Sequence, residues 1–361
     1  MTTISLFLIF YTSFVLFASF AHLIRLDYWW IRIWDFPHLQ VSVMTLLGLL
    51  AWAVFGHAVD GPASLLPIGL VAASFYQGWL IYPYTALHKR EVRSTGKDRK
   101  RQGQATDPDT LRLLTANVYQ ENKKTGEVLE LIEKHQPDIL LLLETNKTWK
   151  QAMSPIEKDF PHQIHCPLEN MYGLLFYSRL PMVSHELRFL IQEDIPSIYV
   201  QLTMASGQLV HFYGVHPMPP SPTEHYRSTE RDAELLLVGK EARHKSGPII
   251  VAGDLNDVAW SHTTRLFQRV SGLFDPRIGR GLFSTFNANY FFLRWPLDHI
   301  FVSHHFELVQ IRRLPNCGSD HFPMLVSLTY NPDPNRAEDL PKPESDDLQE
   351  TKEIIKKATN E

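Results

Sequence analysis

Cysteine is nearly absent from this sequence, and the first quarter of the chain has almost no charge. Only Cys166 and Cys317 occur in 361 residues, far apart and without the spacing of a metal motif. A disulfide-stapled scaffold and a zinc finger are therefore excluded, although a single disulfide between the two stays open. At roughly 150 residues per domain, the length suits about two domains with a sizeable core.

Three long stretches before residue 89 lack Asp, Glu, Lys and Arg altogether. Each is long enough to cross ~30 Å of hydrocarbon as a helix, although three prolines interrupt the last. A cleaved signal peptide would explain only the first stretch, which lacks a cationic start. The alternative is a set of buried helices in a soluble bundle. We predict a membrane domain, 1–88, with three transmembrane helices over about 4–24, 37–59 and 64–88.

Basic residues flank only one side of these predicted spans. Nine Lys and Arg residues lie in 25–35 and 89–101, whereas 1–3 and 57–64 have none. Because basic residues are enriched in cytoplasmic loops, the rest of the chain is expected on the cytoplasmic side. We therefore predict an integral multi-pass protein of the plasma or inner membrane, with a basic flank and linker over 89–110.

From residue 111 the pattern changes to alternating strand-like and helix-like segments. Runs such as LRLLTANVY and DILLLLE are typical of buried strands, and apolar residues recur at helical spacing between them. Adjacent strands mixed with long helical connections predict an α/β sandwich with helices outside two sheets. We expect strands over 111–119, 138–144, 173–178, 197–204, 209–215, 248–254, 297–303, 307–313 and 324–330, and helices over about 125–135, 223–244 and 262–270.

The end of the chain is rich in Pro, Asp and Glu and poor in large apolar residues. We therefore predict an acidic, disordered tail over 331–361, with a short helix at its end as an option. The chain beyond residue 106 also carries more Asp and Glu than Lys and Arg. It lacks the broad basic footprint expected of a nonspecific duplex binder.

Polar residues stand at the ends of the predicted strands in six places. Five follow an apolar strand and one precedes the last strand, where a sheet presents side chains to a cleft. A lone Asn or Asp at such a position more often caps a turn or a helix, so no single residue identifies a site. The six places hold Asn117, Glu144, His216, Asp254 with Asn256, Asp298, and Asp320 with His321.

As a set, these residue types suit phosphoryl transfer. Mg²⁺ prefers oxygen ligands, which Glu144 and Asp320 supply. The reaction also needs a group that positions water, donors for the nonbridging oxygens and a carboxylate that orients a histidine. Two rival chemistries fit poorly. The GxSxG elbow of serine hydrolases is absent, and the adjacent His304 and His305 would face opposite ways in a strand, which is unsuited to zinc.

The order Asn, Glu, His, GDxN, Asp, SDH resembles the endonuclease/exonuclease/phosphatase superfamily. That superfamily includes pancreatic-type deoxyribonuclease, apurinic endonucleases, inositol polyphosphate phosphatases and neutral sphingomyelinases. The resemblance covers roughly 110–330 and implies a four-layer α/β sandwich, here a domain over 111–330 preceded by three transmembrane helices. It also implies a metal-dependent hydrolase of phosphoester bonds with Mg²⁺, or Mn²⁺, as cofactor.

The resemblance implies a metal-binding role for three residues. Glu144 matches the principal Mg²⁺ ligand, helped by Asn117 and, in some members, by the aspartate that matches Asp320. One position departs from the pattern, because apurinic endonucleases carry an acidic residue where this sequence has Tyr119. A second carboxylate ligand at that position, and apurinic endonuclease activity with it, is therefore not implied.

Five further residues match positions around the attacking water and the phosphate. Asp254 is similar to the residue that positions or deprotonates the water, and Asn256 to the residue that holds it and the phosphate. His321 matches a histidine that contacts the phosphate, and Asp298 matches the carboxylate that orients it. His216 matches a second phosphate-side histidine of the deoxyribonuclease and sphingomyelinase branches.

Three classes of function remain. The first is a membrane-anchored, Mg-dependent phosphoesterase that hydrolyses a lipid-linked phosphate ester by metal-assisted water attack. The second is a membrane-tethered endonuclease or exonuclease, and the third a noncatalytic membrane scaffold, which the intact set of site residues disfavours. The expected partners are the lipid bilayer and a phosphoester substrate, lipid-linked or nucleic acid, with no obligate protein partner. Glycopeptide-resistance membrane proteins of the superfamily look similar in layout and are thought to work outside the cytoplasm.

Two further groups are candidates for substrate contact. Six aromatic residues within 283–295 form an apolar loop before Asp298 that suits lipid insertion or a clamp on a base, with plain loop packing as the alternative. Tyr226 and Arg231 are candidates for holding a phosphate near His216, and the alternative for them is an exposed helix face.

Overall fold

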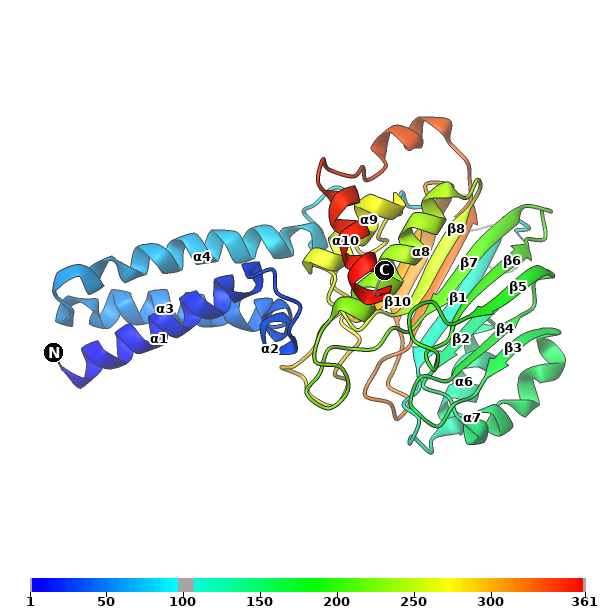
Figure 1. The fold of residues 1–361 in the computed structure, drawn as a ribbon, viewed down its shortest axis with the longest axis horizontal. Coiled ribbons are helices and arrows are strands. Elements are labelled where there is room, and N and C mark those ends of the chain that lie inside the picture. The colour runs from blue at the N-terminus through cyan, green and yellow to red at the C-terminus, as the bar shows by residue number, and fades with distance from the viewer. Residues whose placement is uncertain (1, 97–106, 360–361) are drawn as a thin grey trace. The chain divides into compact units, whose positions relative to one another are not determined.

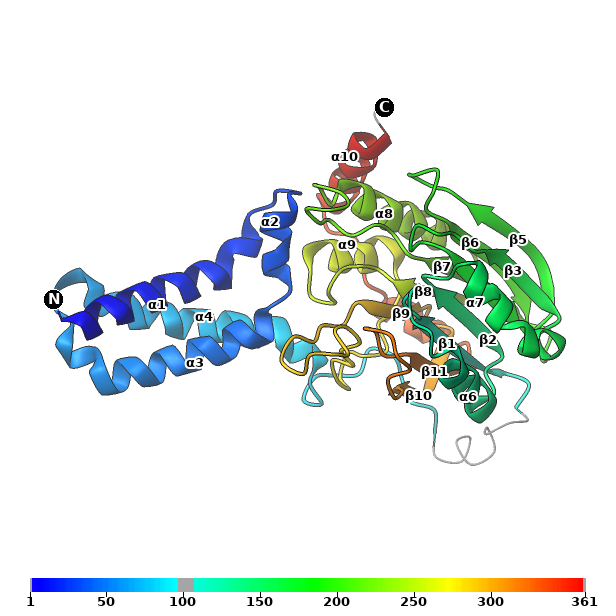
Figure 2. The same ribbon diagram turned by 90° about the horizontal axis from the view of Figure 1, so that it is seen from below.

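The computed structural model describes residues 2–96 and 107–359, and its contacts divide the chain into two units (Figures 1 and 2). The first, which we call the helical unit, comprises Met1–Lys89 and Pro220–Ser228. The second, the sheet unit, comprises Arg90–Pro219 and Thr229–Glu361. Each unit is described by itself.

Three apolar helices form the helical unit: α1 (Thr3–Phe20), α3 (His38–Phe55) and α4 (Leu66–Ile81). Counting the short turns at their ends, three segments are long and apolar enough to cross a membrane: Thr3–Leu23, His38–Phe55 and Gly61–Tyr84. The prolines of the third segment fall at the starts of turns and of α4, where a missing N–H costs no helical hydrogen bond. They therefore do not break the helix.

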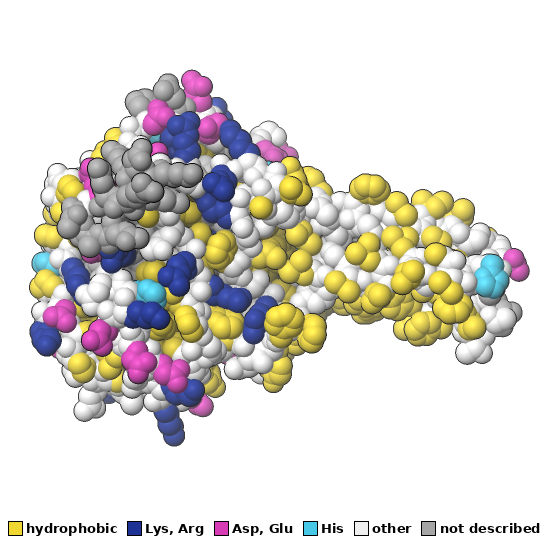
Figure 3. Space-filling model, turned by 180° about the vertical axis from the view of Figure 1, so that it is seen from behind, with side chains coloured by type: hydrophobic (Ala, Val, Ile, Leu, Met, Phe, Trp, Pro, Cys, Tyr) yellow, Lys and Arg dark blue, Asp and Glu magenta, His cyan; other side chains and the backbone are white. Residues whose placement is uncertain are grey.

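Apolar side chains also cover the outside of the helical unit (Figure 3). Phe10 is 74% exposed and Phe75 is 77% exposed, whereas Val15 and Leu70 are buried between the helices. Helices that are hydrophobic all round belong in a core or in a bilayer rather than in water. This surface is the observation that favours a membrane setting over a soluble bundle.

The connection between α1 and α3 contains a short helix, α2 (Trp29–Arg32), and it holds the segment Pro220–Ser228. Arg227 donates hydrogen bonds to both carboxylate oxygens of Asp27, at 3.1 and 3.2 Å, and lies over the ring of Tyr28. The backbone N–H of Trp29 donates to the carbonyl of Tyr226 at 3.1 Å. The sequence analysis predicted a helix that begins at residue 223. Residues 223–228 are not helical, and the helix begins at Thr229.

Two mixed β-sheets form the centre of the sheet unit (Figure 1). The six-stranded sheet has the order β10-β11-β1-β2-β4-β3, with β10 Phe306–Arg313, β11 Met324–Tyr330, β1 Thr110–Asn117, β2 Ile139–Leu143, β4 Leu174–Ser178 and β3 His162–Cys166. The five-stranded sheet has the order β5-β6-β7-β8-β9, with β5 Met182–Arg188, β6 Ser197–Thr203, β7 Leu209–Val215, β8 Ile249–Asp254 and β9 Asp298–Val302.

Helices cover the outer face of each sheet and complete four layers. Side chains of both sheets pack together in one central core, which includes Leu141, Phe176 and Phe212. A second core joins the six-stranded sheet to α6 (Thr125–His135) and α7 (Lys147–Ala152), and a third joins the five-stranded sheet to α8 (Thr229–His244) and α9 (His262–Ser271). The predicted α/β sandwich is confirmed.

Residues just after the helical unit pack in the sheet unit and are not all linker, contrary to the predicted linker over 89–110. Val92 is fully buried in the central core. Thr95 N–H donates to the carbonyl of Leu308 at 3.0 Å, and Leu308 N–H donates to the carbonyl of Arg93 at 2.8 Å. Val92 is a single apolar residue among basic ones, so the sequence pattern gave no sign of its burial. Residues 97–106 of the predicted linker lie outside the described part of the chain.

The segment 331–361 is not disordered throughout, and the helix that the sequence analysis allowed at its end is present. Helix α10 (Asp347–Thr359) packs on α8 and α9 through Ile354 and Ile355. Arg269 forms an ion pair with Asp347 at 2.6 Å, and His262 contacts Glu350 at 2.7 Å. The segment is acidic in overall composition, but it contains an amphipathic helix whose apolar residues recur on one face.

The docking of α10 gives a test of stability. Ile354→Asp places a charge against the apolar surface of α8 and α9, so we expect the free energy of unfolding to fall by about 1–3 kcal/mol. Lys352→Asp changes an exposed residue of the same helix and serves as control. Denaturant unfolding of both variants checks this, and equal stability of the two would contradict the docking of this helix.

Candidate active site

Strand register brings the predicted site residues to one edge of the two sheets. β1 runs parallel to β2, so Asn117 and Glu144 leave neighbouring strands at the same edge. β7 runs parallel to β8, which does the same for His216 and Asp254, and Asp298 stands directly opposite Asp254 in the antiparallel pair of β8 and β9. Because β1 and β2 contact β8 across the sandwich, the two groups meet.

Gly253 allows β7 and β8 to come this close. Its φ is +151°, and a Cβ at this position would stand 1.8 Å from the carbonyl oxygen of Val215. Only glycine tolerates both the backbone angle and the approach. In the Gly-Asp pair of the sequence, Gly253 is therefore required by the backbone geometry, whereas Asp254 supplies a carboxylate to the site.

The Asp254 carboxylate is the centre of the cluster and is 1% exposed. Its Oδ2 accepts a hydrogen bond from Asn117 Nδ2 at 3.1 Å, and lies 3.5 Å from His321 Nε2 and 3.9 Å from His216 Nε2. Its Oδ1 accepts from the backbone N–H of Asn256 at 2.9 Å. Burial raises the pKa of Asp254, but the histidine charges and these hydrogen bonds outweigh burial and lower it.

His321 and Asp298 form a buried pair. His321 Nδ1 lies 2.8 Å from Asp298 Oδ2, and both side chains are almost fully buried. Burial alone would lower the pKa of His321, but the charges of Asp298 and Asp254 outweigh it and raise that pKa to about 10. Burial, together with the charge of Asp254, raises the pKa of Asp298. The geometry matches a histidine held in orientation by a carboxylate.

His216 lies on the other side of Asp254 and is 3% exposed. Its ring packs 5.2 Å from the ring of Tyr172, and its Nδ1 has no hydrogen-bond partner among the described residues. Burial lowers the pKa of His216 to about 4. The imidazole is therefore neutral near pH 7.

Asn117 links Glu144 to Asp254. Asn117 Nδ2 donates to Glu144 Oε1 at 2.6 Å, while the other carboxylate oxygen, Oε2, is buried without a partner among the described residues. Burial raises the pKa of Glu144 to about 7, and the nearby Asp254 and Asp320 act in the same direction. Glu144 also has a φ of +56°, which is uncommon for this residue type and typical of functional sites.

The SDH motif anchors the loop before β11 to the end of β1. Ser319 Oγ donates to the carbonyl of Asn117 at 2.8 Å and accepts from the backbone N–H of His321 at 3.0 Å. Asp320, between them, is partly exposed, and its carbonyl accepts from Ala288 N–H at 2.6 Å. The sequence analysis missed Ser319, although its place in the motif was a usable signal.

Arg231 was a candidate for phosphate contact, with an exposed helix face as the alternative, but its side chain is buried inside the fold. It is 1% exposed, donates to Asp232 Oδ1 at 2.8 Å and lies 3.3 Å from Asp257 Oδ2. Its Nη1 donates to the carbonyl of Asn256 at 2.7 Å. Arg231 thus supports the Asn256 loop from inside the fold. Tyr226, the other candidate for phosphate contact, is 56% exposed in the helical unit.

Two groups of residues at this edge suit a divalent cation. Asp254, Asp298 and His321 offer ligand atoms that all lie within 4.8 Å of one another, but these three already bind each other. Glu144 Oε2 is buried and lacks a partner, and a carboxylate held this way is the hard oxygen ligand that Mg²⁺ or Mn²⁺ requires. The residues at this edge therefore fit a divalent metal.

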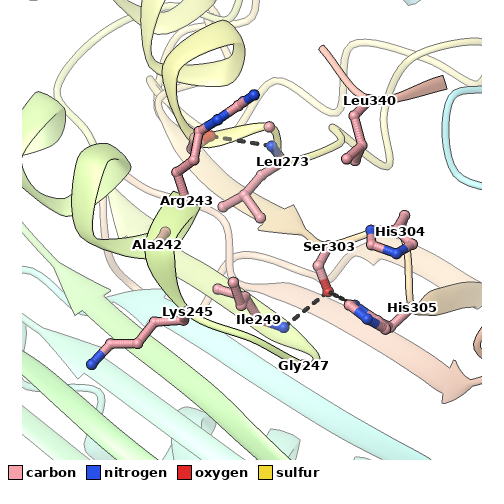
Figure 4. Close-up of a pocket in the computed structure, with 12 residues that line it drawn as sticks. Ala242, Arg243, Lys245, Gly247, Ile249, Leu273, Ser303, His304, His305 and Leu340 are labelled. Atoms are coloured by element: carbon pink, nitrogen blue, oxygen red, sulfur yellow. Dashed lines mark hydrogen bonds between the residues drawn. The ribbon is translucent and has the colours of Figure 1, made fainter. Parts of the chain in front are cut away.

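A separate pocket of about 230 Å³ lies at the opposite edge of the five-stranded sheet (Figure 4). It is lined by the start of β8 at Ile249 and by Ser303, His304 and His305 after the end of β9. The two histidines lie between β9 and β10, outside any strand, and their ring centroids lie 4.0 Å apart. None of the predicted site residues lines this pocket. Cys166 and Cys317 are both free thiols.

A two-sheet sandwich with carboxylates, an asparagine and an oriented histidine at one edge defines a metal-dependent hydrolase of phosphoester bonds. The chain belongs to the endonuclease/exonuclease/phosphatase family, whose family model matches residues 114–321, more than half of its length. The membership predicted from the six sequence blocks is confirmed, and so is the enzyme class.

The chain is also similar to a curated protein and, in its fold, to solved structures. A Vibrio cholerae protein named UPF0294 protein is 25% identical over 287 residues, covering 73% of this chain and 96% of the relative. The fold is similar to D. rerio TDP2 complexed with single-strand DNA product, at 16% identity and TM-score 0.50, covering 61% of this chain and 99% of that one. It is also similar to the human Nocturnin catalytic domain with bound sulfate, at 17% identity and TM-score 0.50, covering 62% and 95%.

The unpartnered Glu144 oxygen gives a test of the metal site. We expect Glu144→Gln to weaken Mg²⁺ or Mn²⁺ binding by at least about tenfold and to abolish most turnover. Its melting temperature without metal should not fall, because the substitution removes a buried carboxylate next to Asp254. Calorimetric metal titration and thermal unfolding check both points, with the exposed Glu133→Gln of α6 as control. Unchanged metal affinity with lost stability would show a structural acid instead.

Proposed function

We propose that this chain is a membrane-anchored, Mg²⁺-dependent phosphoesterase that hydrolyses a lipid-linked phosphate ester. The family supports the reaction class, and the three apolar helices support the anchor. The observation that carries the lipid substrate is an exposed aromatic tip on the loop that frames the site. The three-domain layout, with a membrane domain, an enzyme domain and an acidic C-terminal segment, is part of this proposal.

Asp254 and Asn256 are proposed to act on the attacking water. The lowered pKa of Asp254 keeps its carboxylate ionised at neutral pH, so it can orient a water molecule and accept its proton. Asn256 has a φ of +50° and donates through Nδ2 to the carbonyl of Pro217 at 3.0 Å. Arg231 fixes the same residue through its carbonyl, so it is a positioning residue in this scheme.

His321 is proposed to hold the phosphate oxygens, with Asp298 as its orienting carboxylate. Its bond to Asp298 through Nδ1 leaves Nε2 directed at Asp254, at the place where water and phosphate would meet. The neutral His216 is proposed to contact the phosphate from the other side of Asp254. When bound by Glu144, Asn117 and Asp320, a divalent metal would supply positive charge that stabilises the negative charge of the phosphate in the transition state.

The aromatic tip supports the lipid substrate. Tyr290, Phe291, Phe292 and Leu293 are 61%, 72%, 80% and 47% exposed, and Arg294 lies over the rings of Phe291 and Phe322. Exposed aromatic residues beside a cation are typical of segments that enter a lipid interface.

The same loop joins the tip to the site. Thr285 Oγ1 accepts from Asp298 N–H at 3.2 Å, and the ring of Phe286 packs 4.9 Å from the ring of His321. Ala288, next to the tip, donates to the carbonyl of Asp320. Lipid captured by the tip would therefore lie close to the phosphate-binding residues.

A tethered nuclease is the second candidate. It is favoured by the likeness to D. rerio TDP2, whose structure holds a single-strand DNA product. Exposed aromatic rings also stack on unpaired bases, so the same tip suits a single strand. The acidic balance of the sequence beyond residue 106 favours the lipid over a long nucleic acid.

Replacing the aromatic tip tests its role in lipid hydrolysis. In the full chain with Mg²⁺, replacing Phe291 and Phe292 by Ser should lower hydrolysis of lipid phosphate in vesicles by about tenfold or more, because each phenyl ring in lipid contributes about 1.5–3 kcal/mol. Hydrolysis of a soluble phosphoester by this variant should stay unchanged. Phosphate release from both substrates is the measurement.

Two variants serve as controls in this assay. Phe189→Ser removes an exposed apolar side chain elsewhere in the sheet unit and should leave vesicle hydrolysis intact, and Asp254→Ala is the inactive blank. Rapid, salt-sensitive plasmid nicking that Asp254→Ala eliminates, with no activity on any lipid phosphate, would favour the nuclease.

The side of the membrane is proposed from charge. Because nine basic residues flank one side of the spans and none the other, the sheet unit is proposed to face the cytoplasm. A reporter that is active only in the cytoplasm, fused after residue 361, should therefore give signal, and a periplasm-only reporter should not. The reverse pattern would place the enzyme outside the cytoplasm, with an extracytoplasmic substrate.

A further inference from the structure

Polar side chains gather at one end of the otherwise apolar helical unit. They come from the turn Ala21–Leu23 after α1, from α2 and the turn Ile33–Asp35, from the start of α3 and from the last turns of α4. The turn Ala21–Leu23 contacts both α2 and Ile33–Asp35, so these segments lie together. Buried polar groups in such a unit are costly and call for an explanation.

Two histidines lie at the centre of this cluster. His22 Nε2 is 2.7 Å from the hydroxyl of Tyr76, and His38 Nδ1 is 2.8 Å from Gln77 Oε1. The two imidazole rings meet edge to face, with centroids 4.5 Å apart. His22 thus connects the end of α1 to α4, and His38 connects α3 to α4.

Three donors of the cluster remain unsatisfied. Gln77 is 1% exposed, and its Nε2 has no acceptor among the described residues. The same holds for Nε of Arg32, which is 7% exposed, and for Nε1 of Trp29. Arg32 forms an ion pair with Asp35 through Nη1, at 3.6 Å from Oδ2, but its Nε has no acceptor among the described residues.

Ordinary helix–helix adhesion does not account for these donors. The pair Trp52 and Thr12 is an ordinary interhelical hydrogen bond in this unit. Trp52 Nε1 donates to Thr12 Oγ1 at 2.8 Å, so the indole donor is satisfied. At the other end, the oxygen of Gln77 bonds to His38, and its amide nitrogen has no acceptor within the described part of the chain. An unmatched buried donor of this kind calls for an explanation, and an acceptor ligand would supply one.

We propose that Gln77, Arg32 and Trp29 bind the phosphate group of a membrane lipid, beside the His22 and His38 pair. A phosphate offers several acceptor oxygens and no obligatory donor, which complements three unsatisfied donors, and the Arg32 guanidinium matches its charge. Trp29, Trp30 and Trp34 lie in the same connection and are typical of the headgroup level of a bilayer. The site rests on the proposed membrane setting of the helical unit, but not on catalysis.

Lipid binding by the full chain tests this site. The Asp254→Ala chain in detergent is titrated with phosphatidic acid and with diacylglycerol of the same acyl chains, and bound lipid is measured by native mass spectrometry. Phosphatidic acid should bind at least about tenfold more tightly than diacylglycerol. Because this chain does not turn over, failure of binding here and failure of hydrolysis in the wild type are separate results.

Substitutions within the cluster locate the binding. Gln77→Glu keeps the shape and replaces the free donor by an acceptor, so affinity for phosphatidic acid should fall about tenfold or more. Arg32→Gln should do the same independently. Thr12→Val removes a buried interhelical hydrogen bond elsewhere in the unit and should leave the affinity unchanged.

Three outcomes would overturn the proposal. One is equal binding of phosphatidic acid and diacylglycerol. Another is unchanged affinity in both Gln77→Glu and Arg32→Gln, which would leave the cluster as structural adhesion. The third is binding of inorganic phosphate alone without binding of phosphatidic acid, which would make the free ion the ligand rather than the lipid.

Discussion

The Asp254 carboxylate is the interaction on which the site depends. Its two oxygens contact side chains or backbone from β1, from the end of β7, from the loop after β8 and from the SDH loop. An ionised carboxylate this deeply buried is stable only when enough positive charge and enough donors surround it. The surrounding histidines and amides therefore fix the fold at this edge while they prepare the chemistry.

The sequence predicted those features that follow from simple periodicity or from motif chemistry. The nine predicted strands and two of the predicted helices lie close to their observed positions, because most of these strands are buried and therefore give continuous apolar runs in the sequence. The candidate residues at strand ends also meet in space, since strand polarity alone sends Asn117, Glu144, His216 and Asp254 to one edge. Their individual roles remain proposals that rest on the family resemblance and on this geometry.

The features that were not predicted from the sequence have a common physical cause. They are segments of polar composition that nevertheless pack against other parts of the fold. Strand β3 reads HQIHC and forms the edge of its sheet, and β5 is an edge strand with mostly exposed side chains, so neither shows a buried pattern. The acidic composition gave no sign that helix α10 packs within the sheet unit. Residues 223–228 were predicted as helix, whereas they belong to the helical unit with the distant α1–α3 connection. Such pairings depend on residues far away in the sequence, which local patterns do not report.

Unsatisfied polar atoms distinguish two kinds of buried site in this chain. Trp149 Nε1 and Tyr177 OH are isolated in an apolar core, where a single lost hydrogen bond is a cost of packing. At the sheet edge, in contrast, Glu144 Oε2 and Asp298 Oδ1 are acceptors within one cluster, which suits a cation or a protonated group. At the end of the helical unit, Gln77 Nε2, Arg32 Nε and Trp29 Nε1 are donors, which suits an anion. The named atoms are therefore acceptors in one cluster and donors in the other, and each set indicates the charge of a ligand that would complete it.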